Sequence, residues 1–198
     1  MRTTLPSGMR PRPTPSRLST AIIAAAMSAA AATGCSAETD TSGAPAAVPG
    51  DAGLGLTELP AAPREENATC PYLDSQWVAE ANGQKVTGVA VDDRFETPAC
   101  EFWSYAEQPQ LTVLVRHMAS PQEAMAVVDW ATPIEHTEPA DDPPGWNGGR
   151  HGGGAVPGRA GAAYSVAKGP VAVTVFTNQN ESVKAQVVAE RVIATLGL

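Results

Sequence analysis

The chain has 198 residues, 43% of them hydrophobic, which suffices for one domain of ordinary size with its own core. Its formal net charge of −8 argues against nucleic-acid binding, because that function needs a basic face to displace counterions. No apolar stretch of membrane-spanning length follows the N-terminal region, so no transmembrane helix is expected beyond it.

The first 34 residues have the pattern of an export signal. Four arginines precede an apolar run over 18–32 that is too short to span a bilayer well. The following Ala32-Thr33-Gly34-Cys35 resembles the lipobox of bacterial lipoproteins, with Ala32 in place of the usual leucine. The resemblance implies that Cys35 is acylated, with chains such as palmitate, and becomes the new N-terminus on the extracytoplasmic face of the cell membrane. An ordinary cleaved signal is the alternative.

The segment from the predicted lipidated cysteine through residue 67 contains mostly Ala, Pro, Gly, Thr and Glu without an apolar period. Such a composition cannot bury enough apolar surface to fold alone, so 35–67 is expected to be a disordered tether. The folded domain is then expected over 68–198. A propeptide is the alternative for the tether.

Two cysteines remain, Cys70 and Cys100, and outside the cytoplasm such a pair predicts a disulfide. Two free buried thiols are the alternative. No Cys-x-x-Cys motif occurs and the three histidines, His117, His136 and His151, are scattered, so we expect neither a metal site nor a cofactor.

Predicted elements alternate between strands and helices along 68–198. A helix is expected after the N-cap Asp74, ending at Gly83, and a second after the capping box Ser120-Pro121-Gln122-Glu123. A third helix should run over 181–196. Alternating or apolar runs predict strands over 85–91, 100–105, 111–118, 162–167 and 171–178.

The order strand-strand-helix occurs twice, because 111–130 aligns without gaps on 171–190. Duplication of one unit and the common chemistry of hairpins are both open explanations. Either way the fold class is predicted as α+β, a two-layer sandwich of a mainly antiparallel sheet with helices packed on one face.

A long segment over 132–160 lacks an apolar period and is expected to be a loop. It contains Trp146, Arg150 and His151 among seven glycines, a combination suited to stacking on a ring and binding an anion. Loops of this length are often functional, so these three residues are candidate binding residues. A mobile surface loop with Trp146 tucked against the sheet is the alternative. Its acidic run, Glu135, Glu138, Asp141 and Asp142, fits no calcium-loop spacing and is expected to be solvated.

Three aromatic residues follow Cys100. Phe102 should lie on one face of the sheet, and Trp103 and Tyr105 on the other. If helices cover only one face, an aromatic set is exposed and marks a binding surface; coverage of both faces is the alternative. Trp103 and Tyr105 are therefore further candidate binding residues.

Four segments resemble an actinobacterial family of secreted lipoproteins built on a domain of unknown function: Cys70-Pro71-Tyr72-Leu73, Cys100-Glu101-Phe102-Trp103, 111–117 and Phe176-Thr177-Asn178-Gln179. The resemblance covers the whole expected domain and implies a membrane-anchored, extracytoplasmic protein. It implies no activity and no functional residue. A looser likeness exists to other secreted lipoprotein modules, in which a sheet with helices binds a ligand or a partner.

No catalytic motif is present: the chain lacks Gly-x-Ser-x-Gly, His-Glu-x-x-His and a spare thiol nucleophile. His117 beside Arg116, at the end of an apolar strand face, is expected to be a packed residue. The leading hypothesis is therefore non-catalytic binding of an envelope ligand or protein partner, with the membrane contacted through the lipid anchor. An envelope hydrolase with an unrecognised site near His117 or His151, and a purely structural envelope protein, are the alternatives.

Overall fold

The computed structural model describes Asp51 and residues 53–198. Its elements in chain order are α1 (Ser75–Asn82), β1 (Gly88–Asp92), β2 (Thr97–Trp103), β3 (Leu111–His117), α2 (Pro121–Ala131), the 3-10 turn η1 (Ile134–His136), β4 (Glu138–Ala140), β5 (Asn147–His151), β6 (Ala162–Lys168), β7 (Val171–Thr177) and α3 (Ser182–Leu196). Within this part of the chain, no helix has the length and hydropathy needed to cross a membrane. The predicted export signal and Cys35 lie outside the described residues.

The seven strands form one sheet in the order β1-β2-β3-β7-β6-β5-β4, with every neighbouring pair antiparallel. The five predicted strands are all present, which confirms the mixed α and β class with an antiparallel sheet. β3 and β7 lie side by side at the centre, and their side chains are almost entirely buried.

The predicted helix ends are confirmed by their caps. Asp74 accepts a hydrogen bond from the backbone N–H of Trp77 at 2.9 Å, and Gly83 ends α1 with φ of 75°. At α2, Ser120 accepts from the N–H of Glu123 at 3.2 Å, and the Glu123 carboxylate accepts from the N–H of Ala119 at 3.1 Å. Local sequence therefore sets where both helices begin.

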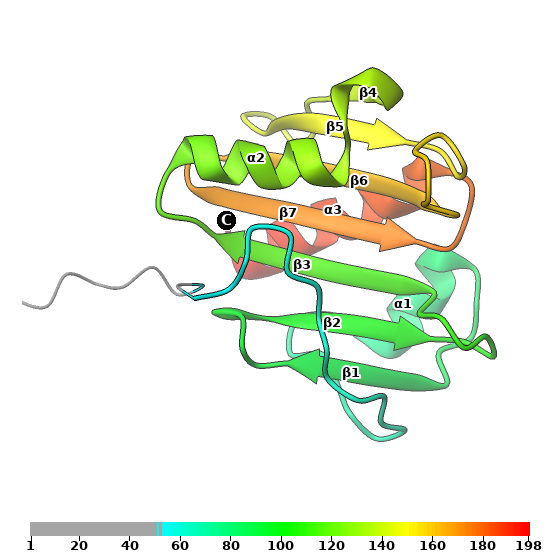
Figure 1. Ribbon diagram of the computed structural model, residues 1–198. Helices are drawn as coiled ribbons and strands as arrows, with labels where there is room; N and C mark the ends of the chain where they lie inside the picture. Colours follow the sequence, from blue (N-terminus) through cyan, green and yellow to red (C-terminus); the bar gives the residue numbers. More distant parts are fainter. Residues whose placement is uncertain (1–50, 52) are drawn as a thin grey trace, which may run out of the picture. The chain divides into compact units, whose positions relative to one another are not determined.

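The helices cover both faces of the sheet, so the prediction of helices on one face is wrong. Val173 and Val175 of β7 belong to the same core as Val188 of α3, whereas Ala172 belongs to a second core with Val128 of α2. Successive side chains of a strand point to opposite faces, so α2 must lie across the sheet from α3. Figure 1 shows α2 in front of the sheet and α1 and α3 behind it.

The two predicted strand-strand-helix units follow different paths in space. The strands alone would suit a two-fold axis, since Leu111 pairs with Thr177 and His117 pairs with Val171, as a symmetric register requires. Such an axis between antiparallel neighbours would place both helices on one face. Because α2 and α3 lie on opposite faces, only the order of the elements repeats.

The prediction of a long loop over 132–160 is also wrong, because this segment contains η1, β4 and β5. β5 pairs with β6 along its whole length and β4 pairs with β5, which extends the sheet by two strands. The glycines serve this packing: a Cβ on Gly148 would overlap the carbonyl oxygen of Ser165, and one on Gly149 would press on the Thr132 hydroxyl. Close approach of β6 explains Gly148, and close approach of the segment after α2 explains Gly149.

Part of the predicted tether is folded. We call Asp51 and residues 53–61 the strap. Figure 1 shows it crossing the sheet over β3, β2 and β1, on the same face as α2. The side chain of Arg116 donates from Nε to the Asp51 carboxylate at 3.0 Å and from its other nitrogens to the carbonyls of Gly55 and Leu56. The prediction of a disordered tether therefore fails for Asp51 and residues 53–67, and residues 35–50 and 52 lie outside the described part.

The Asp51 carboxylate is fully engaged. It also accepts from the backbone N–H groups of His117 at 2.8 Å and Glu96 at 2.9 Å. The side chains of Asp51 and Arg116 are 2% and 1% exposed, so this ion pair lies in the interior. It fastens the start of the strap to β3.

The predicted disulfide is confirmed. Cys70 and Cys100 are bonded, with their Cα atoms 5.8 Å apart and 30 positions apart in the chain. The bond joins the segment before α1 to β2, and both cysteines are buried in the core that α1 and α3 share with the sheet.

Candidate binding groove

The three candidate residues of the predicted loop do not form a site together. Trp146 is 2% exposed and belongs to the main core, with the ammonium of Lys168 5.7 Å from its ring. Arg150 forms an ion pair with Glu138 at 3.3 Å across β4 and β5. His151, its neighbour on the strand, points to the other face and is buried, with Nδ1 2.9 Å from the carbonyl oxygen of Gly152. The structure therefore does not bring these three residues together as a recognition tip.

The second candidate pair is divided by the end of β2. Trp103 is buried, and its indole N–H donates to the carbonyl of Glu107 at 3.2 Å. Tyr105 lies beyond the strand and is 80% exposed. Of the expected exposed aromatic pair, only Tyr105 is exposed. β2 ends at Trp103, so Tyr105 does not continue the alternation of side chains between the two faces of the sheet.

His117 and Glu138 have partners within the fold. His117 Nε2 lies 2.9 Å from the hydroxyl of Thr97, a structural hydrogen bond between β3 and β2. Glu138 pairs with Arg150, and within the described residues no three His, Cys, Asp or Glu side chains gather as a metal site would require.

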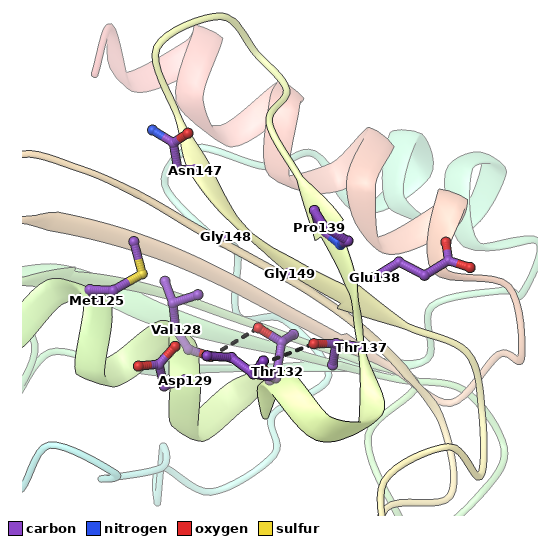
Figure 2. Close-up of a pocket in the computed structure, with 11 residues that line it drawn as sticks. Met125, Val128, Asp129, Thr132, Thr137, Glu138, Pro139, Asn147, Gly148 and Gly149 are labelled. Atoms are coloured by element: carbon purple, nitrogen blue, oxygen red, sulfur yellow. Dashed lines mark hydrogen bonds between the residues drawn. The ribbon is translucent and has the colours of Figure 1, made fainter.

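In two cavities of the described region, several polar groups already have partners within the fold. One, of about 260 Å³, lies between α2 and the β4–β5 pair (Figure 2). Its Thr132 and Thr137 hydroxyls donate to backbone carbonyls, as the dashed lines in Figure 2 show. The other, of about 470 Å³, lies beside α1, where its carboxylate Asp74 caps the helix and Arg191 stacks on Trp77.

The third cavity, of about 520 Å³, has a different character, and we call it the groove. Its floor is one row across three strands, because Glu101 of β2 pairs with Thr112 of β3, which pairs with Phe176 of β7. Directly opposed residues of antiparallel strands share a face, so all three side chains point to the α2 side. The groove therefore occupies the stretch of sheet that lies between the strap and α2.

The walls come from segments far apart in the sequence. Leu59 of the strap stands on one side; Trp130 of α2 and Arg159, which precedes β6, stand on the other. Trp130 and Phe176 meet edge to face, with ring centroids 5.7 Å apart. The Arg159 guanidinium lies 5.1 Å from the first ring and 5.0 Å from the second. It also donates to the carbonyls of Trp130 and Ala131, which end α2.

Two charged side chains of the groove are half-buried and lack partners of opposite charge. Burial raises the pKa of Glu101, and a hydrogen bond of 3.2 Å from the Thr112 hydroxyl opposes this only in part. Burial lowers the pKa of Arg159. Among the ion pairs of the described residues, neither Glu101 nor Arg159 takes part.

The raised pKa of Glu101 predicts that removing its charge stabilises the protein, and that this stabilisation depends on pH. Glu101→Gln should increase the free energy of unfolding at pH 7 by up to about 1 kcal/mol, since the variant keeps the Thr112 contact without the desolvated charge. The gain should vanish near about pH 4, where wild-type Glu101 is protonated. Urea unfolding at both pH values measures it, with the exposed Glu107→Gln as the control. An equal effect of both substitutions would show that Glu101 is not desolvated.

The comparisons with known proteins identify a family without naming an activity. No curated protein matches the chain. The model of the family described as "Domain of unknown function (DUF2020)" matches residues 54–198, which include the groove, most of the strap and the disulfide. The matched range begins inside the strap, in agreement with a fold that starts before Cys70. The chain therefore belongs to the DUF2020 family.

Proposed function

We propose that this protein is a lipid-anchored domain on the extracytoplasmic face of the cell membrane that binds an envelope ligand or partner without catalysis. The anchor is supported by the export pattern and by Cys35 at its end. Because the strap begins at Asp51, the connection from Cys35 spans at most roughly 55 Å when fully extended. The domain would thus remain close to the membrane surface.

The binding role rests on one observation, the groove with its unpaired Glu101 and Arg159. Partial burial of a charge without a partner destabilises the folded protein. A bound molecule that places an opposite charge beside it would offset this desolvation cost. Two further residues that line the groove, Phe176 and Leu59, add apolar contact area.

The arrangement favours binding over the alternative of an envelope hydrolase. A hydrolase of the kind considered would hold His117 or His151 in a cavity beside a carboxylate. Neither histidine lines any of the three cavities described above. Both instead contact groups of the fold itself.

Anchoring is tested by Cys35→Ala. The substitution removes the thiol that would be acylated, so the protein should move almost completely from the membrane fraction to the soluble fraction or medium. Immunoblots of separated fractions measure this, with the wild-type protein as the reference. Retention of the Cys35→Ala protein at the membrane would contradict lipidation at this residue.

Binding at the groove is tested by a substitution on its rim. Leu59 is 49% exposed, so Leu59→Arg should leave the fold intact while placing a long charged side chain at the opening. Ile134→Arg is the matched control, because Ile134 is exposed and lines the cavity beside β4 and β5 instead. Envelope material retained by immobilised wild-type protein should be lost with Leu59→Arg and kept with Ile134→Arg. Equal retention by all three proteins would place binding elsewhere.

A further inference from the structure

We propose that the groove takes a small dipolar ligand that carries an ammonium group at one end and a carboxylate at the other, separated by a flexible chain. This inference rests on the proposed binding function and specifies the class of ligand. It follows from the positions of the two unpaired charges and from the surface between them.

Glu101 defines the cationic end of the ligand. One carboxylate oxygen accepts from Thr112, and the groups that influence its pKa include the acidic Asp92 but no cation. Asp92 is itself neutralised by Arg94, whose guanidinium lies 2.7 Å from it. Glu101 therefore remains as a carboxylate without a cationic partner on the floor of the groove, and an ammonium group would supply a charge-assisted hydrogen bond.

Arg159 defines the anionic end. Its two terminal nitrogens donate to the carbonyls of Trp130 and Ala131, while its Nε–H donates to no group of the described residues. Contact with the rings of Trp130 and Phe176 holds the guanidinium in place before any ligand arrives. A carboxylate at Nε–H would therefore bind a charge that is already oriented.

The sheet sets the separation between the two ends. Glu101 lies on β2 and Arg159 lies over Phe176 of β7, two strands away. Neighbouring strands are about 4.8 Å apart, so the strands below the two charges are roughly 10 Å apart. An α-amino acid is too short to join both charges through its own ammonium and carboxylate. A chain of several methylenes fits this span and would contact Phe176, Leu59 and Pro109.

The test uses 6-aminohexanoate as the probe, with hexylamine and hexanoate as analogues that each lack one charge. Amide chemical shifts of the ¹⁵N-labelled protein would be followed during titration with each compound. We expect 6-aminohexanoate to bind at least about tenfold more tightly than either analogue, with the shifts centred on Thr112, Phe176 and Trp130. Similar weak shifts for all three compounds, or shifts away from the groove, would overturn the proposal.

Two matched substitutions assign the cationic end. Glu101→Gln should reduce the affinity for 6-aminohexanoate to that for hexanoate, whereas Glu107→Gln, an exposed carboxylate outside the groove, should leave it unchanged. If Glu101→Gln binds the probe as wild type does, the proposal is overturned. If the probe fails while Leu59→Arg still abolishes retention of envelope material, the groove binds another class of ligand. If 6-aminohexanoate does not bind and Leu59→Arg also leaves retention of envelope material unchanged, both this proposal and the proposed binding function are contradicted.

Discussion

Replacement of Asp51 by Ala is expected to lower the free energy of unfolding by about 3–5 kcal/mol, the usual cost of leaving one partner of a buried ion pair uncompensated. The variant leaves the Arg116 guanidinium, 1% exposed, without its carboxylate. The backbone N–H groups of His117 and Glu96 lose their acceptor as well. Urea unfolding measures the loss.

A control for this prediction lies at the other end of the strap. Glu58 pairs with Arg94 at 3.1 Å, with both side chains well exposed. Glu58→Ala should therefore cost less than about 1 kcal/mol. If Asp51→Ala were as mild as Glu58→Ala, the strap would not belong to the cooperative fold and could not form a fixed wall of the groove.

Loss of the disulfide is expected to have the second large effect. Reduction of Cys70–Cys100 should lower the free energy of unfolding by about 3–4 kcal/mol, because a closed loop of this length restricts the unfolded chain. Cys100 is completely buried, so the comparison is best made on the wild-type protein with and without reductant. Two urea transitions with the same midpoint would contradict the prediction. Two reactive thiols in the unfolded, unreduced protein would contradict the bond itself.

The sequence predicts those elements whose signals are local. α1 and α2 are marked by Asp74, Ser120 and Gly83, and the central strands by their apolar runs. β5 escapes prediction because Asn147-Gly148-Gly149-Arg150-His151 has no strand propensity of its own. It becomes a strand only by hydrogen bonding along β6.

The sequence of β3 contains a pattern from which coverage of both sheet faces could have been predicted. Leu111, Val113 and Val115 point to one face, but Leu114 and Arg116 on the other face are equally buried. A strand that buries apolar side chains on both sides needs cover on both sides. The strap that supplies this cover over β1–β3 has no such pattern. Its contacts with the sheet, such as the ion pair of Asp51 with Arg116, join residues far apart in the sequence and leave no local signal.

The groove could not be predicted because its residues meet only through the sheet. Glu101 lies within a segment that resembles the family, but its importance depends on Thr112 and Phe176 beside it. Arg159 stands between a glycine and an alanine with no motif around it. The predicted site residues are also aromatic or charged, like those of the groove. Most of them, such as Trp146, instead pack or form bonds within the fold.

The central claim, that binding occurs in the groove between the strap and α2, is tested most directly by amide shift mapping with the small-molecule fraction of the native envelope. The account predicts shifts that cluster at Leu59, Thr112 and Phe176 in the wild-type protein and disappear in Leu59→Arg. Shifts confined to the cavity between α2 and β5, at Met125 and Asn147, would contradict it.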